Sequence, residues 1–250
     1  MNPVLSIKRL CSGYGPVEVL HNITFAVEKD DYIALAGPNG AGKTTLVKTI
    51  LGLMDKYTGT AEVFGQDIRG FKRWDRIGYL PQRVNAFNPL LPAMVREVVG
   101  LGLLSQKHFP KNFTKNDAVS IRQTLDLMDI ADLTDKPIGE LSIGQQQRVF
   151  LARSLVSNPE LLILDEPSTA LDPVSRESFF ELLKKLNVSK GITIILITHD
   201  TAQIGKYANK LLYLDKKVVF YGSFSDFCKS EEMSLYFGHF SQHLICHQHD

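Results

Sequence analysis

The sequence predicts an α/β fold with a mixed sheet, an antiparallel β sub-domain and an inserted α-helical sub-domain. Three observations indicate this class. Short apolar runs of strand type alternate with helical patterns early and late in the chain. A glycine-rich loop follows one of these runs and precedes a helix. Between residues 88 and 138, by contrast, the periodicity is helical.

The first part of the chain reads as strands around a single helix. Residues 5–10 and 19–27 predict two antiparallel strands, joined by the turn-rich residues 12–16. The apolar run 32–36 is typical of a strand covered on both faces. A helix is expected over about 43–53, and further strands over 59–68 and 77–80.

Two helical patterns, 95–104 and 118–128, define the inserted sub-domain. The α/β alternation then resumes with strands at 161–164 and 192–198, separated by a helix over 173–186. Residues 211–214 and 218–221 predict a closing hairpin. We therefore expect one domain over 1–230, with the helical sub-domain inserted at about 88–155, and a histidine-containing tail over 231–250.

Size and charge exclude several classes of protein. The chain has 250 residues, of which 44% are hydrophobic and 22% charged, so it can bury one sizeable core. With 28 basic and 27 acidic residues its formal charge is +1, which removes the electrostatic argument for a nucleic-acid binder. No run approaches the roughly 18 to 20 apolar residues that cross a bilayer, and residues 1–15 lack a signal-peptide pattern. We expect a cytosolic chain.

The glycine-rich loop matches the eight-position P-loop pattern. Its residues are Gly37, Pro38, Asn39, Gly40, Ala41, Gly42, Lys43 and Thr44. In such a loop the glycines turn backbone N–H groups towards a phosphate, the lysine reaches the β- and γ-oxygens, and the threonine hydroxyl meets Mg²⁺. A glycine-rich turn that merely includes a lysine is the alternative. The full match between a strand and a helix favours a P-loop NTPase core.

A second half of the site is expected at the end of strand 161–164, where Asp165 and Glu166 follow four apolar residues. A hard cation beside phosphates needs oxygen ligands, so Asp165 is the candidate for Mg²⁺. Glu166 is the candidate general base that polarises the attacking water. The alternative is that both acids begin a loop and are simply solvated.

Residues 141–145, with the sequence Leu-Ser-Ile-Gly-Gln, resemble the signature motif of ATP-binding cassette (ABC) proteins. The other motifs of the family occur along the chain in the family's order, and the resemblance covers about residues 4–225. It implies that Tyr14 stacks on adenine, that Gln82 touches Mg²⁺ and senses a membrane partner, and that His199 contacts the γ-phosphate. It also implies ATP-site roles for Thr45, Ser142, Gly144, Gln145 and the D-loop residue Asp172.

One position departs from the family pattern. Ile143 stands where the signature normally has glycine, although Ser142 and Gly144 are present. A β-branched residue cannot comfortably take a positive φ, so a positive φ here would strain the site. We expect the function to survive this change.

The resemblance implies a homodimer, because the signature of one subunit completes the ATP site of the other. ATP binding would close the dimer, and hydrolysis by a water held between Glu166 and His199 would open it. This motion would drive a separate membrane permease, with the chain peripheral at the cytoplasmic face. The competing class is soluble cassette ATPases, which typically carry two cassettes or a long coiled coil.

The stretch between Gln82 and Leu104, especially residues 87–92, lies where importers of this family receive the permease. The alternative is that apolar residues such as Val98 and Leu101 only pack the helical sub-domain.

Two features point to a transition-metal cargo. Residues 89–102 resemble the corresponding stretch in ATPases of zinc, manganese and iron(II) importers. Four of the seven histidines, His239, His243, His247 and His249, lie in the last twelve residues together with Cys246. Three of them, His239, His243 and His247, recur every four residues and would share one helix face as a zinc site, although histidine-bearing termini are often disordered. We expect a zinc importer ATPase that uses ATP and Mg²⁺ and works with a periplasmic or lipoprotein metal-binding protein; manganese, iron or another cargo is the alternative.

Overall fold

The computed structural model describes residues 2–82, 92–107, 111–199 and 201–238. The chain divides into two compact units, Met1–Lys72 with Phe179–Asp250, and Arg73–Ser178. Over the described ranges, no helix combines the length and the apolar character needed to cross a membrane.

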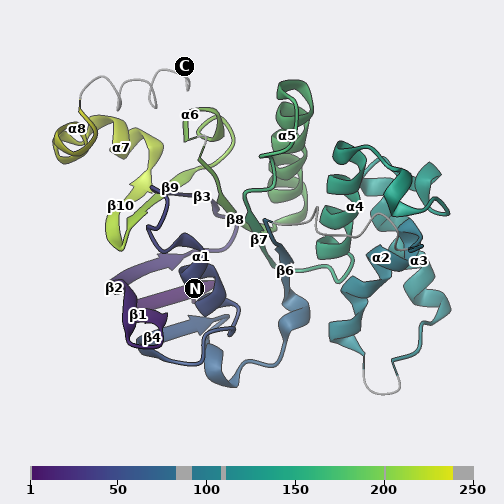
Figure 1. Cartoon of the computed structure of the whole chain (residues 1–250), viewed down its shortest axis with the longest axis horizontal. Helices are drawn as coiled ribbons and strands as arrows, with labels where there is room; N and C mark the ends of the chain where they lie inside the picture. Colours follow the sequence, from purple (N-terminus) through teal and green to yellow (C-terminus); the bar gives the residue numbers. More distant parts are fainter. Residues whose placement is uncertain (1, 83–91, 108–110, 200, 239–250) are drawn as a thin grey trace. The chain divides into compact units, whose positions relative to one another are not determined.

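An antiparallel sheet in the first unit has the strand order β2-β1-β4-β5 (Figure 1). Its strands are β1 (Leu5–Tyr14), β2 (Val17–Val27), β4 (Tyr57–Val63) and β5 (Gln66–Asp67). The predicted first hairpin is confirmed, with Leu5 opposite Val27. The predicted strand 59–68 is wrong in one respect: Phe64 (φ 51°) and Gly65 (φ 76°) form a two-residue turn that divides it, because two successive positive φ values reverse the chain.

The same unit contains the strands β10-β9-β3-β8, in that order. They are β3 (Tyr32–Ala36), β8 (Thr193–Ile197), β9 (Lys210–Asp215) and β10 (Lys217–Ser223). β3 is parallel to β8 and β9, whereas β10 is antiparallel to β9, so the sheet is mixed as predicted. Every residue of β3 and β8 is buried, which explains their continuous apolar sequences.

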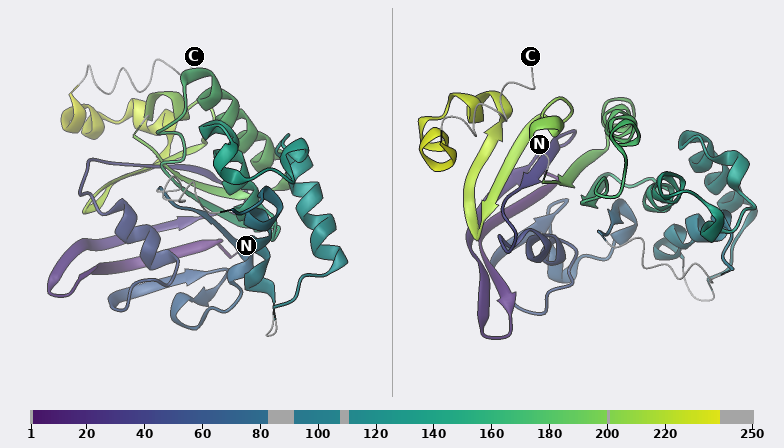
Figure 2. Two further views of the ribbon diagram at one scale, coloured as in Figure 1. Left: turned by 45° about the vertical axis from the view of Figure 1, so that its right-hand side comes forward. Right: turned by 45° about the horizontal axis from the view of Figure 1, so that its top comes forward.

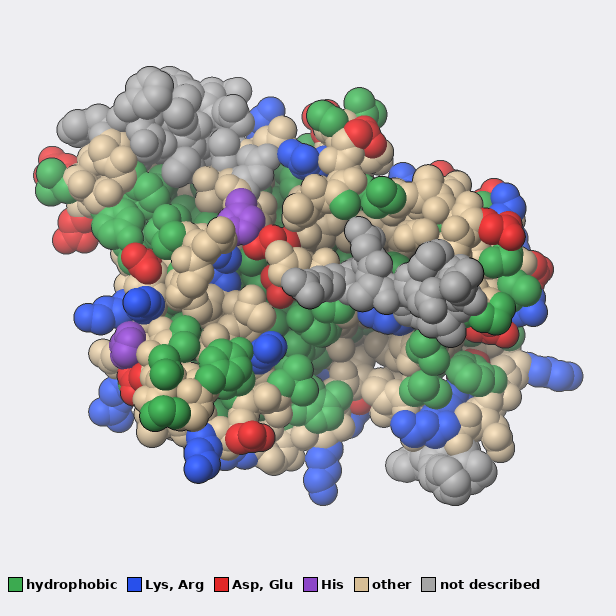
Figure 3. All heavy atoms as spheres, viewed as in Figure 1, with side chains coloured by type: hydrophobic (Ala, Val, Ile, Leu, Met, Phe, Trp, Pro, Cys, Tyr) green, Lys and Arg blue, Asp and Glu red, His purple; other side chains and the backbone are tan. Residues whose placement is uncertain are grey.

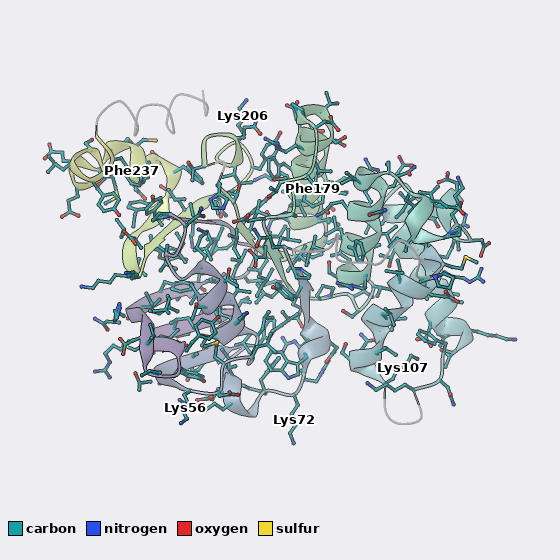
Figure 4. The ribbon with its side chains drawn as sticks, viewed as in Figure 1. Lys56, Lys72, Lys107, Phe179, Lys206 and Phe237 are labelled. Carbon is teal, nitrogen blue, oxygen red and sulfur yellow. The ribbon has the colours of Figure 1, made fainter. Side chains whose placement is uncertain are left out.

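Helices cover these sheets. α1 (Lys43–Ile50) follows β3 and packs on β1, β2 and β4. α5 (Pro173–Lys190) begins in the second unit and continues in the first, where Phe179, labelled in Figure 4, is buried. The shorter elements of the first unit are η1 (Ile68–Gly70), α6 (Thr201–Ile204), α7 (Phe224–Lys229) and α8 (Glu231–Phe237).

An aromatic cluster joins the end of α8 to β9 and α7. Figure 2 shows the ribbon of this region in two further views. The ring of Phe237, at the end of α8, lies 4.7 Å from that of Tyr213 and 5.5 Å from that of Phe227, measured between centroids. Both pairs are edge-to-face, an arrangement that stabilises aromatic contacts beyond simple burial.

The second unit joins a parallel strand pair to a group of helices. The strands are β6 (Ile77–Leu80) and β7 (Leu161–Asp165), and the helices α2 (Val95–Gly100), α3 (Lys115–Leu127) and α4 (Ile143–Leu155) pack on one another (Figure 1). Its 3₁₀ turns are η2 (Trp74–Arg76), η3 (Leu101–Gln106), η4 (Ala131–Leu133) and η5 (Ile138–Glu140). The predicted helix 95–104 is thus an α-helix that continues as a 3₁₀ turn.

Candidate functional site

The P-loop joins β3 to α1, as the sequence predicts. Two of its glycines are needed for shape. Gly37 has φ 148°, and a Cβ there would lie 2.0 Å from the carbonyl oxygen of Leu214. Gly42, the N-cap of α1, has φ 94°, and a Cβ would lie 2.5 Å from Leu20. No side chain caps α1 at this residue, so the first turn of the helix presents its amides and positive dipole end to an anion.

Lys43 lies inside this loop. Its side chain is buried, and its Nζ donates to the carbonyl oxygens of Gly37 at 2.8 Å and Pro38 at 3.0 Å. The next residue, Thr44, is exposed, whereas Thr45 is buried. The loop is therefore closed around the ammonium group, with one hydroxyl left at the surface. Of the other loop residues, Asn39 and Gly40 are exposed and Ala41 is buried.

His199 lies at the same sheet edge as the P-loop. β3 and β8 are parallel, with Leu35 opposite Ile197, and the Thr198 N–H donates to the Leu35 carbonyl at 3.2 Å. The carboxyl ends of both strands therefore lie together, and His199 is exposed there.

Tyr14 lies beside α1, in the same unit. Its ring is half exposed, and the Nζ of Lys48 on α1 lies 3.4 Å from its hydroxyl and 5.5 Å from its ring centroid. Lys48 could not be predicted from the sequence as a partner of Tyr14, because 34 residues separate the two and no local pattern links them.

Gln82 and Glu166 meet in the second unit. β6 and β7 are parallel with Leu80 opposite Leu164, so the residues after each strand emerge at one edge. There the Nε2 of Gln82 donates to Oε2 of Glu166 at 2.6 Å. Glu166 has φ 50°, a conformation uncommon for a residue with a side chain. Its carbonyl oxygen accepts from the hydroxyl of Thr169 at 3.1 Å, which fixes the turn after β7.

Two aspartates, Asp165 and Asp172, lie at and after the end of β7. Asp165 is 4% exposed, at the end of β7. Burial, together with the charge of Asp165, raises the pKa of Tyr79 to about 12. Hydrogen bonds from Ser175, and from the amide of Val174, hold the pKa of Asp172 below its ordinary value. Asp172 thereby caps the first turn of α5.

The signature residues begin helix α4. Ser142 is the N-cap: its Oγ accepts from the Gln145 amide at 3.3 Å, and Oε1 of Gln145 accepts from the Ser142 amide at 3.0 Å. Ile143 is the first helical residue, is half exposed and has a negative φ. The strain considered for a β-branched residue therefore does not arise. Gly144 follows on the same turn.

A family model of the ABC transporter matches residues 20–169. The chain belongs to the ABC transporter family. It is 42% identical to the zinc uptake system ATP-binding protein ZurA of Listeria innocua, over 89% of this chain and 87% of that protein. It is 38% identical to the manganese transport system ATP-binding protein MntB of Halalkalibacterium halodurans, over 90% and 88%. The solved dimeric structure of a bacterial ABC transporter cassette matches with a TM-score of 0.74 and 28% identity, over 88% of this chain and 98% of that one.

This ABC ATPase carries its candidate residues in two groups. Tyr14, the P-loop and His199 belong to the first unit; Gln82, Asp165, Glu166, Asp172 and the signature belong to the second. The candidate zinc ligands His239, His243 and His247 lie outside the described residues, as do His249 and Cys246. Within the described part, no group of three or more His, Cys, Asp or Glu residues could hold a metal.

Proposed function

We propose that this ABC ATPase powers uptake of a transition-metal ion, with zinc as the cargo. The observation that carries the proposal is the identity with a zinc uptake ATP-binding protein over most of both chains. Manganese is the second candidate, since the manganese relative is only slightly less similar.

The described residues fit ATP with Mg²⁺. The glycine-shaped loop, the open N-terminus of α1 and the Lys43 ammonium suit phosphates, and the ring of Tyr14 suits adenine. Thr44, Gln82 and Asp165 offer the oxygen atoms that a hard cation prefers. Bound Mg²⁺ would neutralise part of the phosphate charge. These residues would hold the nucleotide in place during hydrolysis.

Glu166 would act as the general base, with His199 at the γ-phosphate and Lys43 stabilising the negative charge that develops there. Gln82 already donates a hydrogen bond to the Glu166 carboxylate, so movement of Gln82 would reorient the base. In a homodimer, Ser142, Gly144, Gln145 and Asp172 would complete the partner subunit's site.

The transporter would further need a membrane permease and a periplasmic or lipoprotein metal-binding protein, with this chain at the cytoplasmic face. Of the proposed permease patch, residues 83–91 lie outside the described residues. The packing interpretation is confirmed for Val98, which is 1% exposed, and wrong for Leu101, which is 47% exposed. Leu101 is thus available to a partner.

The tail would bind zinc through His239, His243 and His247, since imidazole groups are common zinc ligands. A zinc titration of the full chain against a variant with all three histidines replaced by alanine tests this. Equal zinc affinity of the two chains would contradict the tail site.

Deleting the gene under metal limitation tests the cargo. Uptake and cell content of zinc, manganese and iron are measured in cells with the wild-type gene, without it, and with Glu166→Gln. We expect zinc uptake to fall in the last two strains and to return with the wild-type gene. A selective fall in manganese would favour the second candidate, and no change in any metal would contradict metal transport.

A further inference from the structure

A small pocket opens in the second unit, between β6, η3 and the end of α4. Its volume is about 240 Å³, and its walls include Tyr79, Leu101, Ser105 and Arg153. Pockets for small-molecule ligands usually span roughly 300–1,000 Å³. The pocket therefore matches a single side chain better than a free cofactor.

Two glycines shape it. A Cβ at Gly102 would lie 2.0 Å from the carbonyl oxygen of Arg153, and a Cβ at Gly78 would lie 2.3 Å from that of Ser154. Both β6 and η3 thus run directly against the backbone of α4. These contacts fix the backbone around the pocket, and side chains such as Tyr79, Leu101 and Arg153 complete its walls.

Arg153 gives the pocket a charge. It is half-buried, and its guanidinium carbon lies 5.2 Å from the ring centroid of Phe150. Burial lowers the pKa of Arg153. A buried charge without an opposite charge is costly, and an incoming carboxylate would offset that cost.

The other arginines of this unit show the contrast. No acidic side chain within the described ranges pairs with Arg153. Five other arginines of this unit do have a carboxylate partner: Arg73 with Asp75, Arg76 with Glu160, Arg96 with Asp135, Arg122 with Asp126, and Arg148 with Asp129. The rim adds the exposed residues Ser105, with a hydroxyl donor, and Leu101.

The pocket is linked to the candidate base through β6. Its wall residue Tyr79 belongs to β6, and Gln82, two residues after the end of that strand, donates to Glu166. An occupant of the pocket would therefore contact the strand that positions Gln82, the partner of the proposed base.

The geometry points to a carboxylate side chain, Asp or Glu, from a cytoplasmic loop of the permease as the occupant, paired with Arg153. This inference rests on the proposed function, because it supplies the chemistry by which that permease is recognised. An acidic loop residue would satisfy the guanidinium, while apolar neighbours in the loop would cover Leu101.

Co-purification with the permease of the same transport system tests the pairing. The full chain carries a tag, and the variants are Arg153→Met, Ser105→Glu and the control Arg122→Met, which removes an exposed guanidinium from α3. Ser105→Glu keeps Arg153 but offers it a carboxylate within the chain, at an exposed position. ATP binding and the thermal midpoint show that each variant is folded.

We expect Arg153→Met and Ser105→Glu to reduce permease binding and metal uptake about tenfold or more, with Arg122→Met at the wild-type level. A further variant, Arg153→Glu, reverses the charge of the pocket. Replacing single acidic residues of the permease loops with lysine should restore the binding of this variant at one permease position. Wild-type binding by both pocket variants, or no restoring position, would overturn the inference. The inference would also be overturned by the following pair of results: acetate or phosphate raises the thermal midpoint of the wild type but not of Arg153→Met, and the two proteins bind the permease equally.

Failure of the proposed function and failure of the pocket assignment give different results. If the wild-type chain binds no permease and its deletion changes no metal uptake, the proposed function is wrong. If the wild type binds and transports but the pocket variants do the same, only the pocket assignment is wrong.

Discussion

Glu166 occupies a position where backbone and side chain are both constrained. Its φ is 50°, and Gln82 donates to its carboxylate at 2.6 Å. Such strained residues persist only where the surrounding structure fixes them, and here the Thr169 hydroxyl and β7 do so. The constraint holds the carboxylate at the strand end, where the proposed base is needed.

Replacing Glu166 with Gln should leave ATP affinity close to the wild-type value and lower turnover by about a hundredfold or more, because the amide cannot accept a proton from water. Steady-state ATPase activity and nucleotide binding check this. Glu160→Gln is the matched control, since Glu160 pairs with Arg76 at the start of the same strand. Turnover of Glu166→Gln near the wild-type rate would show that another residue is the base.

Tyr32 carries a buried hydroxyl that finds no hydrogen-bond partner within the described residues. Tyr32→Phe should therefore leave the free energy of unfolding unchanged or raise it by up to about 1 kcal/mol. Tyr221→Phe is the comparison, since the Tyr221 hydroxyl donates to the Ala26 carbonyl, and its loss should cost about 1 kcal/mol. Urea unfolding measures both, and a Tyr32→Phe protein less stable than Tyr221→Phe would contradict the reasoning.

At the scale of elements, helix α4 shows how a family departure is accommodated. Ile143 starts the helix with an ordinary negative φ, and Ser142 with Gln145 caps it. Ile143→Gly should keep ATPase activity within a factor of about three. It should lower helix stability by up to about 1 kcal/mol, because glycine loses more backbone freedom. A large gain in turnover would show that the isoleucine obstructs the site.

The start of helix α3 contains a carboxylate that should respond to pH. Asp117 accepts from Lys107, labelled in Figure 4, at 2.6 Å and from the Thr114 hydroxyl at 2.7 Å. These contacts lower its pKa from 3.8 to about 2, with Lys107 the largest cause. Since the folded pKa is depressed, its stabilising effect is present above pH 3.8 and is lost as the pH falls towards 2.

Wild type and Asp117→Asn should therefore differ in urea midpoint by a constant amount above about pH 5, and the difference should shrink below pH 4. A difference in urea midpoint that is as large at pH 2 as at pH 5 would contradict the assignment of Lys107 and Thr114 as the cause.

Local patterns explain which elements the sequence could predict. β3 and β6 have the predicted bounds, because a short apolar run bounded by turn residues specifies a buried strand. The turn at Phe64 was missed, since an aromatic residue with positive φ is rare. The helix after Val95 changes to a 3₁₀ turn at Leu101, beside the close approach of Gly102 to Arg153, which no local pattern shows.

In the candidate site, too, local patterns predict some residues, whereas other contacts depend on the fold. The P-loop, the two acids at the end of β7 and the signature are contiguous motifs, so their positions could be predicted from the sequence. The bond from Gln82 to Glu166 and the contact of Lys48 with Tyr14 join residues far apart in the chain. Such pairs depend on strand register and helix packing, and only the folded chain defines them.

At the scale of the whole molecule, acidic and basic side chains are interspersed on the face in Figure 3, and the chain has 28 basic and 27 acidic residues. Assembly should therefore depend on specific contacts more than on long-range attraction. In the proposed homodimer, the relevant contact would be the one that brings the signature of one subunit to the P-loop of the other.

Subunit complementation tests that assembly. Lys43→Ala removes the ammonium group of the P-loop, and Ser142→Arg obstructs the signature, so each variant alone should lack ATPase activity. In an equal mixture about half of the dimers are mixed, and each has one intact site, so activity should return to about a quarter of the wild-type value. ATPase assays of the separate and mixed proteins measure this. A mixture as inactive as its components would show that each chain completes its own site, or that both sites must be intact for turnover.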